Sequence, residues 1–169
     1  TRRAGGIWRP ERIIAEKWLT ARGVAGWDRG AGEVRSRSPD VVGLVEAGGT
    51  GPVRHRFWQE QCPAYSVSTL GSGMVLLVKG RVEQAGSGSL RGTGRFRRFD
   101  VSVRGHEFTL VLVDIEGSLR NPRQFPLKQL AARLEPLDDR PVILMGDFNT
   151  PSDSAWFEPI RERFDNAFD

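Results

Sequence analysis

The stretch Pro141-Val142-Ile143-Leu144-Met145-Gly146-Asp147-Phe148-Asn149-Thr150 decides how this 169-residue sequence is interpreted. Its first five residues form an apolar run that is short enough for a buried strand. Asp147 and Asn149 follow directly, and residues two apart in extended backbone point to the same side. We therefore predict a strand over 141–145 that ends at a polar pocket, with Phe148 turned into the core.

A second apolar run also ends at an acidic residue. Residues 41–45 follow the turn Ser38-Pro39-Asp40 and end at Glu46. If the two strands are neighbours, Glu46 joins Asp147 and Asn149 in one pocket. Carboxylate and amide oxygens without Cys or His form a site that suits Mg²⁺ or Mn²⁺ and not Zn²⁺. The alternative is structural, because Asp and Asn are common turn residues and strands often end in a charged residue.

The rest of the chain mixes helices and strands. The patterns predict helices over 10–22, 53–61, 126–137 and from about 152 to 164, the last capped by Thr150 or Ser152. They predict strands over 64–70, 74–79, 96–104 and 108–115, a loop or weak helix over 23–37 and a mobile segment over 85–95. Neighbouring antiparallel strands with helical crossovers favour an α/β or α+β fold with a mixed sheet. The length suits a single domain over residues 1–169.

Composition and charge exclude some classes of protein. The single cysteine, Cys62, excludes an internal disulfide framework and a Cys-rich zinc site. No apolar run reaches the ~18 residues that a membrane span needs. Residues 1–37 and 79–106 each carry a balance of +5, and residues 135–169 carry −6. This distribution suits an anionic substrate beside a cation site, although solvated faces would give the same totals.

Taken together, the two strand-end motifs resemble the signatures of the endonuclease/exonuclease/phosphatase superfamily. Residues 40–46 are similar to its D-hydrophobic-hydrophobic-x-L-x-E motif, and residues 141–150 to its apolar strand followed by G-D-F-N. The turn at 71–75 looks like the family's middle section, so the resemblance covers about residues 38–165. It implies two mixed β-sheets packed face to face with helices outside, a four-layer sandwich that this chain would hold in incomplete form.

The resemblance also implies metal-assisted hydrolysis of a phosphate ester, in first place a phosphodiester as in a nuclease. By position, Glu46 would be the Mg²⁺ or Mn²⁺ ligand, Asp147 would orient or deprotonate the attacking water, and Asn149 would hold the phosphate. Asp114 falls where many members carry a His, and would lie beside or behind the metal; its alternative is a surface turn residue. The loop in which members often carry a substrate-side Arg holds Arg120 and Arg123.

Two family positions are absent. The first asparagine is Asn121, and neither His55 nor His106 can supply the closing Asp-His pair. Either both ends have been trimmed, as the start at Thr1 suggests, or the protein is a catalytically incomplete member that acts as a binding module. We expect a cytoplasmic monomer, or a membrane-tethered or exported protein if an upstream hydrophobic segment was removed.

Nucleic acid is a possible partner. The arginine excess favours a polyanion slightly, but a GC-rich genome would produce the same excess. A basic strip in the predicted hairpin would either be a solvated face or contact a nucleic-acid backbone; it consists of Arg91, Arg95, Arg97 and Arg98.

Overall fold

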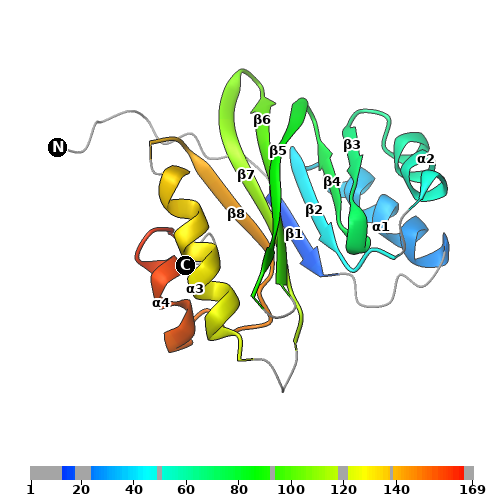
Figure 1. Ribbon diagram of the computed structural model, residues 1–169. Helices are drawn as coiled ribbons and strands as arrows, with labels where there is room; N and C mark the ends of the chain where they lie inside the picture. The colour runs from blue at the N-terminus through cyan, green and yellow to red at the C-terminus, as the bar shows by residue number, and fades with distance from the viewer. Residues whose placement is uncertain are drawn as a thin grey trace. The chain divides into compact units, whose positions relative to one another are not determined.

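The computed structural model describes residues 13–17, 24–48, 51–91, 94–117, 122–137 and 139–165 (Figure 1). Two compact units divide the chain. The first contains residues 1–81 and 102–107, and the second contains residues 82–101 and 108–169. The assignment of residues 1–169 to a single domain stays a prediction.

The first unit is built on a four-stranded sheet with the order β1 (Ile13–Lys17), β2 (Val41–Val45), β4 (Val75–Val78) and β3 (Ser66–Thr69). Strand β1 runs parallel to β2, whereas β4 is antiparallel to both of its neighbours. Every residue of β2 and β4 is buried. Uninterrupted apolar runs are what strands covered on both faces require.

Two helices pack on this sheet, α1 (Val24–Arg37) and α2 (Pro52–Gln61). Figure 1 shows both near β3 and β4, away from β1. Their buried residues form one core cluster with alternate residues of the two buried strands: Ala31, Val34, Trp58 and Cys62 with Val42, Leu44, Val75 and Leu77. Burial of Ala31 and Val34 offsets the entropic cost of the glycines in α1, so the helical alternative for residues 23–37 is the correct one.

The helix expected over residues 10–22 is wrong for residues 13–17, which form strand β1. Each of these five residues pairs with one residue of β2. Backbone pairing with a buried strand outweighs the weak helical preference of a short segment, since propensity is only a weak prior on structure.

The second sheet has the order β5 (Arg81–Leu90), β6 (Gly94–Val103), β7 (His106–Ile115) and β8 (Val142–Asp147). Arg104 and Gly105 alone connect β6 to β7, with φ of 50° and 81°. Two residues with positive φ form the tight turn of an antiparallel hairpin. Strands β7 and β8 are parallel. The expected α/β class with two mixed sheets and accompanying helices is therefore confirmed.

The tip of the β6–β7 hairpin belongs to the first unit, although most of both strands belongs to the second. Arg104 at this tip forms an ion pair with Asp40, whose side chain is only 3% exposed, at an Nη2–Oδ1 distance of 3.1 Å. The hairpin thus supplies the cationic partner of a buried carboxylate at the start of β2.

The mobile segment expected over residues 85–95 is wrong for residues 85–90, which belong to β5, and for residues 94 and 95, which belong to β6. Residues 92 and 93 lie outside the described residues. Leu90 is buried in the core of the unit. A Cβ atom added to Gly88 would lie 2.7 Å from Cε1 of Phe96 on the neighbouring strand. Here glycine marks a close cross-strand approach and not mobility.

Helices α3 (Gln124–Leu134) and α4 (Glu158–Arg161) cover one face of β7 and β8 (Figure 1). The leucine stripe expected over 126–137 is confirmed: Leu127, Leu130 and Leu134 are buried against Val111 and Val113. The short 3₁₀ turns η2 (Glu135–Leu137) and η3 (Ala155–Phe157) follow α3 and precede α4. The C-terminal helical segment is therefore shorter than expected.

The expected cap of this last segment is also corrected. Ser154, and neither Thr150 nor Ser152, occupies the N-cap of η3, where its Oγ accepts a hydrogen bond from Trp156 N at 3.3 Å. Within the described ranges, no helix combines the length and the apolar character that crossing a membrane requires.

Gly146 tests the close approach of β7 and β8. Its φ is 138°, and an added Cβ atom would lie 2.0 Å from the carbonyl oxygen of Val113. We expect Gly146→Ala to cost at least about 3 kcal/mol in the free energy of unfolding, because backbone must move. Gly105→Ala is the control: its φ is also positive but the space is open, so only about 1 kcal/mol of strain is expected. Urea unfolding measures both, and equal costs would contradict the packing argument.

Tyr65 provides a second test. Its hydroxyl donates to Pro39 O at 2.7 Å, and burial raises the pKa of Tyr65 from 10.0 to about 12. The unfolded chain therefore loses this proton first, and the free energy of unfolding should fall as the pH rises from about 10 to about 12. Tyr65 is the only tyrosine, so its ultraviolet absorbance can be followed directly. A native midpoint near pH 10 would contradict the burial.

Candidate functional site

The end of β8 forms a tight polar turn. Asn149 N donates to Asp147 Oδ1 at 2.9 Å, and Asn149 Nδ2 donates to Asp147 Oδ2 at 2.8 Å. Nδ2 also donates to Ile115 O, at the end of β7, at 2.7 Å. Asn149 has a φ of 46°, a conformation that asparagine tolerates better than most residues. The expected meeting of the two side chains is therefore present, through a turn and not through extended backbone.

Phe148, between the two polar residues, points into the core as expected. Its ring packs edge-on against Phe157 with centroids 5.1 Å apart, and it contacts the cluster beneath α3. The packing of Phe148 against the core thus holds the turn in place, while Asp147 and Asn149 on either side of it remain half-buried.

Asp114 lies beside Asp147. The two residues are register partners in the parallel pair β7–β8, so the carboxylates leave the same end of neighbouring strands. Asp114 is 7% exposed, and its Oδ2 lies 3.5 Å from Arg95 Nε. The surface-turn alternative for Asp114 is therefore wrong. Arg95 supplies the counter-charge that a buried carboxylate requires.

Arg123 approaches the same turn from the start of α3. A Cβ atom added to Gly117 would lie 2.9 Å from Asn149 Oδ1 and 3.5 Å from Arg123 Nη2, so Gly117 allows this approach. The Nε of Arg123 is buried and has no hydrogen-bond partner in the part of the chain that the structure describes. Arg120 lies outside the described residues.

Glu46 belongs to the other unit. It is exposed and has a φ of 56°, so the chain turns sharply where β2 ends. The loop that follows is held by the 3₁₀ turn η1 (Gly71–Gly73): Ala47 N donates to Gly73 O at 2.8 Å. A Cβ atom added to Gly73 would lie 3.2 Å from the Glu46 Cα. That Glu46 shares one pocket with Asp147 and Asn149 stays a prediction.

Arg54 organises this loop, and sequence reasoning missed it. Its side chain is buried, at 1% exposure, and it donates to the carbonyl oxygens of Gly48 and, at 2.9 Å, of Leu70. Burial lowers the pKa of Arg54. The signal was its spacing four residues before the buried Trp58, which places both on one helix face. The neighbouring Val53 is 72% exposed. The apolar residue thus faces solvent and the charged residue is buried, the reverse of the usual arrangement.

The two histidines belong to the first unit. His106 is exposed beside the hairpin turn, as expected. His55 lies on α2, where its Nδ1 is 3.4 Å from Thr69 Oγ1.

The donor set bears on which metal is possible. Within the described ranges, no three His, Cys, Asp or Glu side chains come close enough together to hold a metal ion. A closed zinc or calcium site needs at least three or four protein ligands close together. Mg²⁺ is usually bound by one or two carboxylates and keeps several waters, so the oxygen donors present fit Mg²⁺ or Mn²⁺.

The chain matches the model of the Endonuclease/Exonuclease/phosphatase family over residues 28–168. No curated protein shows significant sequence similarity to it.

Solved structures share its fold at low identity. D. rerio TDP2 complexed with single strand DNA product is 22% identical, with a TM-score of 0.61 over 88% of this chain and 64% of that one. The human Nocturnin catalytic domain with bound sulfate is 14% identical, with a TM-score of 0.64 over 88% and 68%. The mannosyl-6-phosphatase Bt3783 of Bacteroides thetaiotaomicron is 14% identical, with a TM-score of 0.63 over 89% and 69%. The chain thus spans about two thirds of each.

Arg54→Lys tests the clamp on the Glu46 loop. One ammonium group cannot replace a guanidinium that reaches two separate carbonyls, so we expect a loss of about 2 kcal/mol in the free energy of unfolding. Arg56→Lys is the matched control, because Arg56 is exposed on the same helix, and it should change stability by less than about 0.5 kcal/mol. Urea unfolding compares the two, and equal effects would contradict the clamp.

Proposed function

Because this chain belongs to the endonuclease/exonuclease/phosphatase family, we propose that it hydrolyses a phosphate ester with the help of a divalent metal, and that its substrate is a phosphodiester of nucleic acid. The observation that supports this most is the carboxylate of Asp147. Asn149 holds both of its oxygens at the end of β8, beside Asp114, and Gly117 lies against both Asn149 and Arg123.

Asp147 is the proposed base or orienting group. The two carboxylate oxygens accept hydrogen bonds from the backbone and side-chain nitrogens of Asn149. A carboxylate fixed in this way can orient a water molecule and accept its proton within hydrogen-bond distance. Phe148 and Gly146 hold the backbone on either side, so the carboxylate is preorganised before substrate binds.

Asn149 is proposed to hold the phosphate, as the resemblance implies, and the geometry adds a condition. Both Nδ2 protons already donate, one to Ile115 O and one to Asp147 Oδ2. A phosphate contact therefore requires one of these bonds to open. In the closed arrangement Asn149 positions Asp147, and Arg123, whose Nε is buried without a partner among the described residues, is the better placed donor to an anion.

Glu46 is the proposed ligand of Mg²⁺ or Mn²⁺. Arg54 and η1 hold the backbone of the loop that follows Glu46. When bound, such a metal polarises a phosphate oxygen and stabilises charge in the transition state. Asp114, beside Asp147 on the neighbouring strand, is proposed to support the metal or the substrate indirectly. Arg95 balances the charge of Asp114.

The substrate class rests on charge and on the neighbours. Nucleic acid fits the arginine excess, and D. rerio TDP2 was crystallised with a single strand DNA product. Bt3783 is named as a phosphatase of mannosyl 6-phosphate, so a small phosphate monoester is the competing substrate. A binding module without activity is the competing function.

Thermal unfolding with EDTA, Mg²⁺ or Mn²⁺ tests the metal site. Metal at ~100 times its dissociation constant should stabilise the wild type by about 2.7 kcal/mol, which corresponds to roughly 5–10 °C. Glu46→Gln should abolish the shift, whereas Glu83→Gln, an exposed control on β5, should retain it. No shift in the folded wild type would favour the binding module.

Hydrolysis tests the role of Asp147. Asp147→Asn should lower turnover of a phosphodiester by at least about a hundredfold, because a general base contributes about that much, while the variant still unfolds cooperatively in EDTA. Turnover of a phosphodiester and a phosphate monoester should be measured side by side. Normal turnover in this variant would refute the assignment, and a preference for the monoester would refute the substrate class.

A further inference from the structure

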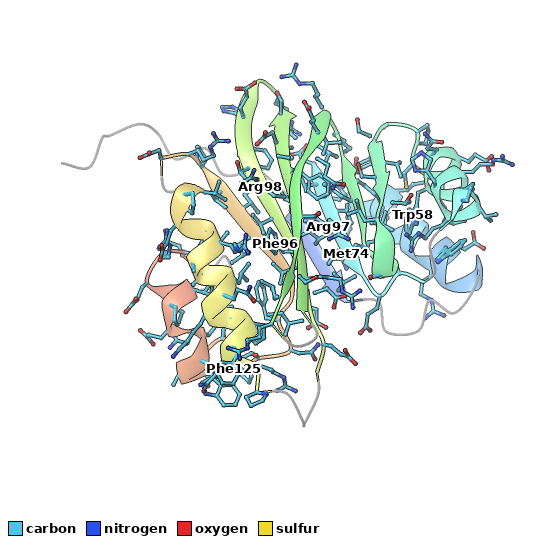
Figure 2. All side chains as sticks on the ribbon, in the orientation of Figure 1. Trp58, Met74, Phe96, Arg97, Arg98 and Phe125 are labelled. Atoms are coloured by element: carbon cyan, nitrogen blue, oxygen red, sulfur yellow. The ribbon has the colours of Figure 1, made fainter. Side chains whose placement is uncertain are left out.

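An open groove of about 620 Å³ lies at the end of the second unit where β5 stops and α3 begins. Its volume is within the range of small-ligand sites, about 300–1,000 Å³. Figure 2 shows Phe125, one of its lining residues, at the start of α3. The groove is lined by Ser89, Leu90, Arg91, Phe125, Lys128 and Gln129.

The lining combines an exposed aromatic ring with two cations. Phe125 is 44% exposed, which is unusual for an aromatic residue on a helix whose next two residues are buried. The guanidinium of Arg91 lies over this ring, 5.4 Å from its centroid. Lys128 is exposed one helical turn after Phe125. Among the described residues that line the groove, none is acidic.

Hydrogen bonding fixes this arrangement. The backbone N–H of Arg91 donates to Gln129 Oε1, which ties the end of β5 to α3. Leu90 is buried directly beneath. The ring and the guanidinium therefore stand on a rigid base that joins a strand to a helix.

Contacts connect the groove to the candidate site within the same unit. Asn149 lies against Gly117, and Gly117 lies against Arg123. Arg123 immediately precedes α3, two residues before Phe125. The groove and the candidate site are therefore linked through Arg123 and the first turn of α3.

We propose that this groove binds a nucleotide of a single-stranded nucleic acid next to the phosphate at Asp147 and Asn149; the inference rests on the proposed function and names the strand form of its substrate. A base stacks on the Phe125 ring or on the Arg91 guanidinium, and Lys128 contacts the adjoining phosphate. Stacking on aromatic residues and charge contacts to the backbone are the general means by which proteins bind single strands. A duplex hides its base faces, so it cannot use the ring in this way.

The other arginines of the basic strip do not extend the groove. Arg95 pairs with Asp114. Arg97 and Arg98 donate to the backbone oxygens of Phe96 and Ala85, and adjacent residues of a strand point to opposite faces. Figure 2 places both along β6, away from Phe125. The strip is therefore not one nucleic-acid surface, and Arg91 is its only member in the groove.

Fluorescence anisotropy with a labelled oligo-dT strand of about twelve nucleotides tests the proposal. Measurement in EDTA removes any contribution from metal or cleavage. Phe125→Ala should weaken binding about five- to a hundredfold, the usual effect of losing one stacked base. Phe125→Leu, which keeps the apolar volume, should weaken it similarly. Arg91→Ala should also weaken binding, because it removes the guanidinium beside the ring. Lys128→Ala should reduce the slope of log affinity against log salt by about 0.7, the effect of losing one phosphate contact to a single strand.

Arg133→Ala is the matched control, because Arg133 is an exposed arginine on the same helix, outside the groove. It should change the affinity much less than Arg91→Ala does. The proposal is overturned if Phe125→Leu binds like the wild type, or if a duplex of the same length binds as tightly as the single strand. If metal stabilisation and hydrolysis both fail while binding remains sensitive to Phe125, the groove stands and the proposed activity does not.

Discussion

One side-chain amide joins the ends of two parallel strands. Asn149 Nδ2 donates to Ile115 O on β7 and to Asp147 Oδ2 on β8, so the same group closes the sheet edge and orients the carboxylate. Without this bond, the carbonyl oxygen of Ile115 would lose its hydrogen bond from Asn149, which costs free energy of folding. The stability of this end of the sheet therefore depends on the same side chain that orients Asp147. Gly146 and Gly117 make the arrangement possible, because side chains at either position would collide with Val113 or with Asn149 itself.

The two candidate acidic groups are presented in different ways. The carboxylate of Asp147 is held in place by two hydrogen bonds, one from the backbone N–H of Asn149 and one from its side-chain amide. Glu46 is presented by its backbone, which adopts a φ of 56° and is braced by η1 and by the buried Arg54. A positive φ at a residue other than glycine persists only where the surroundings enforce it. This bracing role explains why Arg54, at 1% exposure, donates to backbone oxygens of the described residues.

Sequence patterns predicted most strands and helix α3, because apolar runs and leucine spacing report directly on burial. They failed where a partner strand decided the outcome: residues 13–17 pair with β2, and the glycines of β5 make room for Phe96. At the site, Asp147 and Asn149 were identified from order along the chain. Arg54 and the Phe125 groove were not predicted. Sequence patterns assume that charged residues are exposed and aromatic residues are buried, and these two residues do the opposite.

The interleaving of the two units bears on how the chain folds during synthesis. Residues 102–107 complete the first unit, yet they are reached only after the chain has passed through β5 and most of β6. Asp40 is buried in the finished structure and meets Arg104 only then. Because a buried carboxylate without a counter-charge is strongly unfavourable, the first unit cannot reach its final state on the ribosome until residue 104 has emerged. No single cut in the chain would separate the two units from each other, because each is made of two segments that alternate along the sequence.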